Sequence, residues 1–363
     1  FNMAAPCAKQ IPPLLSKFQG CLASAVIGDC LGASWEGMCS IKMREINKYM
    51  SDLENKHAGK PLLEFTKEYT DDTAMARQVA MSLIENQGFD ASSMAKRFSE
   101  EYFEEPWRGY GGNVINVFQQ LKDLNYKDPF KPSQEQFGGS GSYGNGGAMR
   151  IAPAALFSYN SDIEELNALS RNITMLTHSN INGINGAILE SSAIYLALHQ
   201  PADEPLDVNK YIGILLEIMK KLECNYAPEK ELEATPSELK QTPYCDKLNI
   251  IKELLKEEET SIEDIEKQLG HNISALESVP TAIYTFLRGL SPIPGIEDQG
   301  NPLKRTVMFA IAIGGDVDTI GTMAAAITGA YYGMDIVPQT LTYCCEGVQD
   351  SLKFAHKLHT LAG

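Results

Sequence analysis

Two short acidic motifs stand far apart in the chain: residues 70–73 read Thr-Asp-Asp-Thr, and residues 316–319 read Asp-Val-Asp-Thr. Each follows a turn or a short apolar run and precedes a stretch with helical periodicity. Clustered carboxylate and hydroxyl oxygens suit hard divalent cations such as Mg²⁺, whereas Zn²⁺ prefers Cys and His. The motifs therefore predict a Mg²⁺ site where two helices begin.

Both motifs also have a simpler interpretation. Asp and Thr commonly cap helix N-termini, but one Asp would suffice, and two adjacent carboxylates repel each other without a cation. Gly314 and Gly315 let the backbone bend around a ligand, although a glycine turn into a tightly packed helix is the alternative. Together the motifs favour a two-metal site, whose cations stand about 3.5–4 Å apart, so two Mg²⁺ ions are expected.

Residues 137–150 form a glycine-rich segment, Phe-Gly-Gly-Ser-Gly-Ser-Tyr-Gly-Asn-Gly-Gly-Ala-Met-Arg. No strand precedes its GxGxxG pattern, which argues against a dinucleotide fold, and the Lys-Ser/Thr of a P-loop is missing. Successive backbone N–H groups can still bind phosphate. Phe137 and Tyr143 could sandwich a purine. We expect a nucleotide-like ligand, with a flexible surface loop as the alternative.

Three weaker candidates accompany these motifs. Glu36 lies in a loop bounded by Gly32 and Gly37, apart from the metal motifs, and could be a mobile acid or base, or simply a solvated side chain. His178 could bond a ligand or be a structural histidine. Residues 109–112 (Gly-Tyr-Gly-Gly) offer a second backbone approach to the ligand, or merely a turn.

The remaining pattern predicts a single all-α domain. Apolar residues recur at helical spacing around Phe18, Met75, Ile188 and Ile212. The best candidate for a strand, residues 307–313, is a continuous apolar run that fits a buried helix equally well. No linker separates the two acidic motifs, so both halves of the chain are expected to build one site.

Composition limits the partners. The 363 residues carry a formal net charge of −16, which argues against a broad nucleic-acid-binding face. The eight cysteines form no CxxC pair and are expected to be reduced thiols, and no membrane span is expected near residues 319–334. Residues 1–10 are expected to be a tail, residues 11–363 the domain, and residues 227–243 a mobile loop; residues 1–2, before the first Met, are excluded.

The motifs resemble a known family. Residues 28–36 (Gly-Asp-Cys-Leu-Gly-Ala-Ser-Trp-Glu), 70–73, 142–147 and 315–319 are similar to the ADP-ribosylhydrolase family, relatives of the bacterial dinitrogenase-reductase-activating glycohydrolases. Two further segments, residues 277–288 and 329–334, resemble the branch that cleaves ADP-ribosyl-serine and poly(ADP-ribose). The resemblance covers almost the whole chain and is weakest over residues 201–267.

That resemblance implies an orthogonal all-α fold around a binuclear Mg²⁺ centre. It implies these metal ligands: Glu36, Thr70, Asp71, Asp72, Asp316, Asp318 and Thr319. It implies these residues at the ADP-ribose: Asp71, Phe137, Ser140, Gly141, Ser142, Tyr143, Gly144, Asn145, Gly146, His178 and Ile273. Ser140 stands where some relatives carry a basic residue, which leaves open how phosphate is held. Glu36 would transfer a proton and Asp316 would orient the water.

The implied activity is Mg²⁺-dependent cleavage of the O-glycosidic bond between ADP-ribose and serine, and also of poly(ADP-ribose) and O-acetyl-ADP-ribose. Its transition state would resemble an oxocarbenium ion. The alternatives are a non-catalytic, crystallin-like ADP-ribose-binding protein and a two-metal phosphohydrolase. The expected partners are ADP-ribosylated proteins and poly(ADP-ribose). We expect a monomer without direct DNA or membrane binding, acting in the DNA damage response in the nucleus and cytoplasm, with the mitochondrial matrix as a further candidate.

Overall fold

A computed structural model of the chain describes residues 13–38, 41–57, 66–201, 204–224, 242–257 and 259–362. These residues form helices and no β-strand, and two isolated bridges join residues 67 with 345 and 144 with 274. The all-α, single-domain prediction is therefore confirmed. The segment expected to be a mobile loop, residues 227–243, lies outside the described residues up to residue 241.

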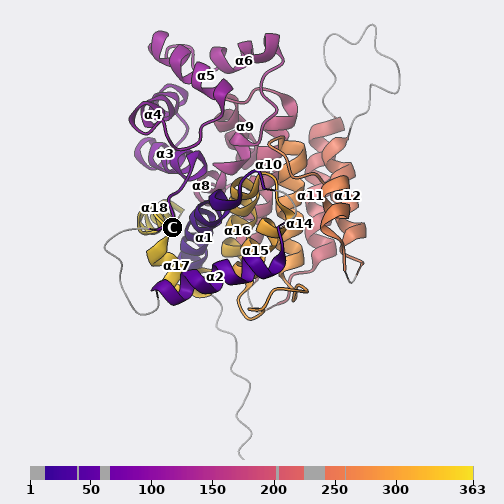
Figure 1. Ribbon diagram of the computed structural model, residues 1–363. Coiled ribbons are helices and arrows are strands. Elements are labelled where there is room, and N and C mark those ends of the chain that lie inside the picture. The colour runs from indigo at the N-terminus through magenta and orange to yellow at the C-terminus, as the bar shows by residue number, and fades with distance from the viewer. Residues whose placement is uncertain are drawn as a thin grey trace, which may run out of the picture.

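Helices account for most of the described chain (Figure 1). In chain order they are α1 (Leu14–Gly32), η1 (Ala33–Trp35), α2 (Met43–His57), α3 (Asp71–Asn86), α4 (Ala91–Glu104), α5 (Gly112–Asp123), α6 (Lys131–Glu135), η2 (Gln136–Gly139), α7 (Gly146–Met149), α8 (Ala152–Phe157), α9 (Ile163–Met175), α10 (Ile181–His199), α11 (Val208–Cys224), α12 (Pro243–Leu254), α13 (Ile262–Gln268), α14 (Ala275–Gly289), α15 (Pro302–Ile313), α16 (Val317–Tyr332), η3 (Met334–Ile336), α17 (Gln339–Cys344) and α18 (Val348–Ala362).

Helices α1 and α16 pack backbone to backbone at the centre of the molecule (Figure 1). A Cβ added at Gly28 would lie 2.3 Å from the carbonyl oxygen of Gly321, and one at Gly329 would lie 2.0 Å from that of Gly20. Only glycines permit this approach, because any side chain would collide with backbone. The small residues of α16 therefore bring the start of the second acidic motif against α1.

The turn between α15 and α16 aims the second motif. Gly314 and Gly315 have φ of 77° and 76°, in the left-handed region that favours glycine. Residues 307–313, the candidate strand, are instead the last part of α15 and are buried throughout. A fully apolar run carries no periodicity that separates helix from strand, and the helix begins well before it, at Pro302.

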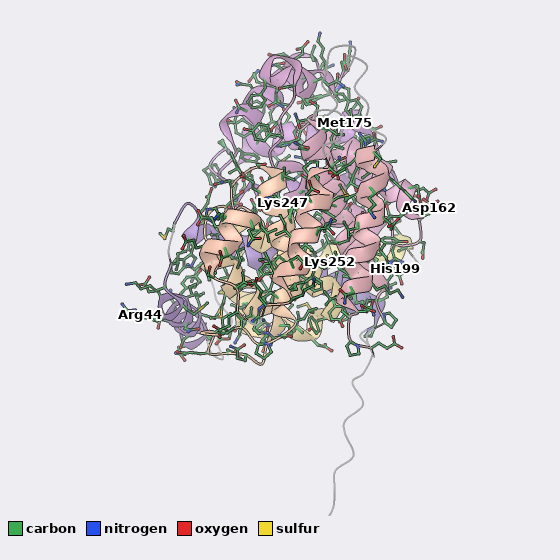
Figure 2. The ribbon with its side chains drawn as sticks, turned by 90° about the vertical axis from the view of Figure 1, so that its right-hand side faces the viewer. Arg44, Asp162, Met175, His199, Lys247 and Lys252 are labelled. Carbon is green, nitrogen blue, oxygen red and sulfur yellow. The ribbon has the colours of Figure 1, made fainter. Side chains whose placement is uncertain are left out.

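Other helices surround this central pair. In the view of Figure 1, α3 and α4 lie to the left of the pair, α5 and α6 at the top, and α11 and α12 to the right. Figure 2 shows the face with α12, where the Lys247 ammonium donates to the backbone oxygens of residues 268 and 269 at 2.8 and 2.9 Å, at the end of α13. That contact satisfies carbonyls that a helix C-terminus leaves without partners.

Among the described residues, one helical stretch is long and apolar enough to cross a membrane by length and composition. Leu14–Trp35 meets that test, but 78% of its most apolar window is buried inside the protein, as expected for the central helix of a packed core. The described cysteines carry free thiols, in agreement with the expected reduced state; they are Cys21, Cys30, Cys224, Cys245, Cys344 and Cys345.

Candidate active site

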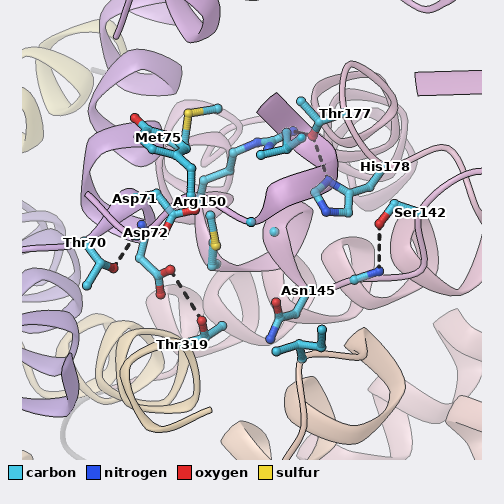
Figure 3. Close-up of a pocket in the computed structure, with 18 of the residues that line it drawn as sticks. Thr70, Asp71, Asp72, Met75, Ser142, Asn145, Arg150, Thr177, His178 and Thr319 are labelled. Carbon is cyan, nitrogen blue, oxygen red and sulfur yellow. Dashed lines mark hydrogen bonds between the residues drawn. The ribbon is translucent and has the colours of Figure 1, made fainter. Parts of the chain in front are cut away.

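A cavity of about 290 Å³ lies where the starts of α3, α7 and α16 meet (Figure 3). Every residue implied as a metal ligand lines it, together with part of the implied ADP-ribose site. The implied residues on its wall are Glu36, Thr70, Asp71, Asp72, Ser142, Gly144, Asn145, Gly146, His178, Ile273, Asp316, Asp318 and Thr319. The fold thus brings the two acidic motifs and the glycine loop to one pocket.

The first acidic motif opens α3, and its capping residue is Thr70, not an aspartate. The Thr70 hydroxyl accepts a hydrogen bond from the backbone N–H of Asp72 at 3.3 Å. The Asp72 side chain is buried, and its Oδ2 atom has no hydrogen-bond partner. Because a threonine does the capping, the carboxylates of Asp71 and Asp72 remain available to a ligand.

Asp29 of α1, which sequence motifs alone did not single out, holds the first motif in place. Its carboxylate accepts backbone N–H bonds from Thr70 and Thr73 at 3.1 Å, and their hydroxyls donate to it at 2.9 and 2.6 Å. Burial raises the pKa of Asp29 to about 6, while these hydrogen bonds lower it. One side chain therefore fixes both threonines that bracket the two aspartates.

Arg108 fixes the same motif from the other side. Its carbonyl oxygen accepts the N–H of Asp71 at 2.7 Å. Its buried guanidinium donates to the carbonyl oxygen of Tyr69 at 3.2 Å and bidentately to the Glu346 carboxylate at 2.6 and 3.0 Å. Because residues 109–112 follow directly and line the pocket, this contact also places that glycine-rich turn.

The second motif brings Asp316 and Asp318 together with Glu36. Ligand oxygens of the three carboxylates lie within 4.8 Å of one another, the spacing of a site that could hold a metal ion. The backbone N–H of Asp316 donates to His271 O at 2.8 Å. The Asn145 side-chain amide donates to Asp316 Oδ2 at 2.5 Å, so the glycine loop and the acidic cluster are in direct contact.

The electrostatics of this cluster demand a counter-charge. Burial raises the pKa of Asp71 to about 8 and that of Asp318 to about 10, and neighbouring carboxylates add to both shifts. Burial raises the pKa of Asp72 well above its usual value, and Oδ1 of Asp318 has no hydrogen-bond partner. Buried carboxylates with unpartnered oxygens ionise readily only beside a cation, so the donor set fits a hard divalent metal.

Glu36 lies closer to the second motif than its sequence position suggested. The N–H of Gly37 donates to Gly315 O at 2.9 Å, and the N–H of Gly315 donates to Met38 O at 3.2 Å. The sequence had indicated that the Glu36 loop is independent of the metal motifs. Instead, the backbone after Glu36 is hydrogen-bonded to the second motif. Glu36 as a whole residue is exposed, but its carboxyl group points toward the cluster and is partly desolvated. This partial burial, followed by the charge of Asp316, raises the pKa of Glu36.

The inner half of the glycine loop pairs with the segment before α14. The N–H of Asn145 donates to Ile273 O at 2.9 Å, and the N–H of Ala275 donates to Tyr143 O at 3.1 Å. Four backbone N–H groups here have no acceptor within the described part of the chain: those of Ser142, Tyr143, Gly146 and Gly147. This arrangement leaves several neutral donors for an anion.

The outer half of the loop does not reach the cavity. The implied ligand-binding residues that do not line it are Phe137, Ser140 and Gly141 of this half, together with Tyr143 of the inner half. The Ser140 carbonyl accepts the Asn180 amide at 3.0 Å, and a Cβ at Gly141 would lie 2.2 Å from Ser179 Oγ, so this half packs against the start of α10. Phe137 and Tyr143 are 51% and 54% exposed, which leaves both rings free for contact from solvent.

His178 lines the pocket beside the loop, and a buried arginine stands behind it (Figure 3). Nη2 of Arg150 donates to the Thr177 hydroxyl at 2.7 Å, and that hydroxyl lies 2.7 Å from Nδ1 of His178. Sequence reasoning named neither Arg150 nor Thr177 as a site residue. The only signal was an arginine directly after a glycine loop that lacks a basic residue.

The chain as a whole is similar to known proteins. The ADP-ribosylglycohydrolase family model matches residues 11–363. ADP-ribosylhydrolase ARH3 of Homo sapiens is 42% identical over 347 residues, covering 95% of this chain and 93% of its own length. The Gallus gallus protein of the same name is 43% identical over 356 residues, covering 96% and 94%.

A solved structure described as an ADP-ribosylglycohydrolase-related protein complex has a TM-score of 0.61 at 20% identity, covering 96% of this chain and 99% of its own. At that identity the likeness supports the fold alone. The family model and the ARH3 relatives carry the assignment further. This chain belongs to the ADP-ribosylglycohydrolase family.

Proposed function

We propose that this protein is a Mg²⁺-dependent glycohydrolase that releases ADP-ribose by cleaving its O-glycosidic bond to serine, and that it also acts on poly(ADP-ribose) and O-acetyl-ADP-ribose. The observation that carries the proposal is the 2.5 Å contact between Asn145 and Asp316. It joins a loop with free N–H donors to a cluster of buried carboxylates, and a ligand with both a diphosphate and ribose hydroxyls suits such a pocket.

The carboxylate side would hold two Mg²⁺ ions. The unpartnered oxygens of Asp72 and Asp318 and the grouping of Glu36 with Asp316 support this assignment, because hard cations take oxygen ligands. Bound there, the ions would hold and polarise the 2″- and 3″-hydroxyls of the ribose.

Glu36 and Asp316 would move the protons. The raised pKa of Glu36 suits a group that protonates the departing serine oxygen or takes a proton from water. Asp316 is held by the Asn145 amide and by its own N–H bond to His271 O, so its carboxylate is oriented well enough to align the water. An oxocarbenium-like ribose would then be attacked by that water.

Two rivals remain: a non-catalytic ADP-ribose-binding protein and a phosphohydrolase that attacks the diphosphate. A serine-ADP-ribosylated peptide is incubated with Mg²⁺ and with EDTA, and the products are identified by mass. With Mg²⁺ we expect free ADP-ribose and the peptide with an unmodified serine, and with EDTA we expect no reaction. AMP with a phosphoribosyl peptide would establish the phosphohydrolase, and no turnover under either condition would establish the binding protein.

An arginine-ADP-ribosylated peptide serves as the matched substrate control. It presents the same ADP-ribose through an N-glycosidic bond, so the two peptides differ only in the bond that is cut. We expect it to be unreacted, in keeping with the serine-directed branch. Localisation in the nucleus and cytoplasm and a monomeric state belong to the same proposal, supported by the sequence resemblance alone.

A further inference from the structure

The His178 ring lies directly over the glycine loop. A Cβ added at Gly146 would lie 2.6 Å from Cε1 and 2.9 Å from Nε2 of His178, and one at Gly144 would lie 3.3 Å from Nε2. The Nε2 edge of the ring therefore faces the glycine loop at Gly144 and at Gly146, and the N–H of Gly146 has no acceptor among the described residues. Glycine is required there because the imidazole occupies the space of a side chain.

The opposite edge of the ring is held by a chain of hydrogen bonds. Arg150 Nη2 donates to Thr177 Oγ1 at 2.7 Å and to Ile173 O at 3.0 Å. The Thr177 hydroxyl lies 2.7 Å from Nδ1 of His178 and has no other acceptor among the described residues. An arginine can only donate, so the threonine oxygen accepts a hydrogen bond from it, and the threonine O–H donates to Nδ1, its one remaining acceptor among the described residues. Nδ1 is then an acceptor, and the ring proton stands on Nε2.

Burial makes this arrangement stable. Arg150 and Thr177 are 1% and 0% exposed, and the guanidinium also stacks over Phe98 at 4.6 Å. Burial, with the charge of Arg150, lowers the pKa of His178 to about 3, so the ring is neutral at neutral pH. Arg150 is the single Lys or Arg among the described residues that line the pocket, which also holds five carboxylates.

We propose that Arg150 and Thr177 are positioning residues that hold His178 with its proton on Nε2, as a neutral donor to an oxyanion of the diphosphate on the glycine loop. This would explain how a loop with Ser140 in place of a basic residue binds phosphate, because the cation acts from behind the histidine. The identity of the ligand rests on the proposed function, whereas the position of the proton does not.

The first test needs no variant and no ligand. Nitrogen NMR of the ¹⁵N-histidine-labelled full chain distinguishes a protonated from an unprotonated ring nitrogen. We expect His178 of the wild type to carry its proton on Nε2 and none on Nδ1 between pH 6 and 8. A proton on Nδ1, or a doubly protonated ring, would overturn the proposal whether or not the variants described next fold.

The second test removes the hydroxyl. Thr177→Val keeps the shape but cannot bond Nδ1, and one lost hydrogen bond should weaken ADP-ribose binding, measured by calorimetry, roughly 3–10-fold. Thr177→Ser restores the hydroxyl and should restore both the affinity and the Nε2–H signature. Thr174→Val is the matched control, because its hydroxyl bonds only the carbonyl oxygen of Ser170 in its own helix, at 2.7 Å.

The outcomes separate the two proposals. Loss of the Nε2–H signature in Thr177→Val but not in Thr177→Ser or Thr174→Val supports the chain of hydrogen bonds. Equal affinity and an unchanged signature in Thr177→Val would overturn it. Failure of the wild type to bind ADP-ribose would overturn the diphosphate as the ligand, and with it the proposed function, while the NMR result on the free protein would still decide the position of the proton.

Discussion

The two sides of the pocket differ in how they are built. On the acidic side, buried carboxylates are crowded together and held by Asp29 and Arg108, whose contacts are charge-assisted. On the glycine side, neutral backbone N–H groups and a neutral imidazole face the cavity, and two aromatic rings are about half exposed. On the acidic side, ionised carboxylates would repel one another unless a cation is bound. On the glycine side the donors are neutral, so no such repulsion arises.

This difference indicates where each side acts. Strong fields and raised carboxyl pKa values are useful where bonds break, and neutral donors are useful where a product must bind and then leave. We therefore expect changes on the acidic side to affect turnover and stability strongly, and changes on the glycine side to affect affinity modestly.

Glu36→Gln should affect turnover alone. The amide keeps the size of the side chain, but it can neither exchange a proton with the substrate nor carry a negative charge. Removing a general acid or base costs roughly 10²–10⁴-fold in rate. Hydrolysis of ADP-ribosyl-serine peptide is measured with ADP-ribose affinity as the control. A near-native kcat would remove Glu36 from the chemistry, and a parallel loss of affinity would make it a structural residue.

Asp29→Asn should destabilise the acidic side. In the wild type, backbone N–H groups donate to the Asp29 carboxylate; in the variant, the amide nitrogen of the new side chain would take the place of one acceptor oxygen. Hydrogen bonds to charged groups contribute about 1.5–3 kcal/mol each to stability. Urea denaturation measures the free energy of unfolding. Glu190→Gln is the control, because that carboxyl of α10 is equally buried but has no hydrogen-bond partner. Equal effects of the two changes would mean that the contacts of Asp29 contribute nothing.

Gly28→Ala should disturb the packing of α1 on α16, the helix that begins with the second acidic motif, and so lower the stability of the protein. The added methyl group would lie 2.3 Å from the Gly321 oxygen, and overpacking typically costs about 1–3 kcal/mol. Gly213→Ala of α11 is the control, because nothing lies within 4 Å of its added Cβ and alanine is favoured in a helix by about 1 kcal/mol. Thermal unfolding should shift in opposite directions, and a shared direction would contradict close packing of α1 on α16.

Phe137→Ala and Tyr143→Ala should have the smallest effects. If each ring stacks on adenine, its loss costs on the order of 1 kcal/mol, a several-fold weaker affinity for ADP-ribose. Phe103→Ala removes a ring that is 39% exposed away from the pocket and should leave the affinity unchanged. Unchanged affinity in both glycine-loop variants would show that the adenine lies elsewhere.

The sequence predicted most of the acidic side and less of the glycine side. Metal-type carboxylates are recognisable because their number exceeds what capping needs, and Thr70 indeed does the capping. Asp29 was missed because it occupies a position in the helical repeat of α1, and Arg150 was missed because a single arginine after a loop indicates no particular function. The pairing of residue 145 with residue 273 could not be predicted, because such contacts depend on the whole fold. Residues 307–313 stayed ambiguous because an unbroken apolar run has no period.

If the crowded carboxylates of the pocket are built for a divalent cation, the thermal stability of the metal-free protein must depend on pH. The pKa values of Asp71 and Asp318 rise to about 8 and about 10, above the value of about 4 in an unfolded chain. Between those values the native state binds more protons than the unfolded state, so the free energy of unfolding falls as pH rises.

In EDTA, therefore, the Tm of the wild type should fall from pH 5 to pH 8. Saturating Mg²⁺ should raise the Tm most at pH 8 and remove the slope, because the cation replaces the protons. The double variant Asp316→Asn, Asp318→Asn should show a shallower slope and no response to Mg²⁺. A wild-type Tm that is flat with pH in EDTA and unmoved by Mg²⁺ at pH 8 would contradict the metal site.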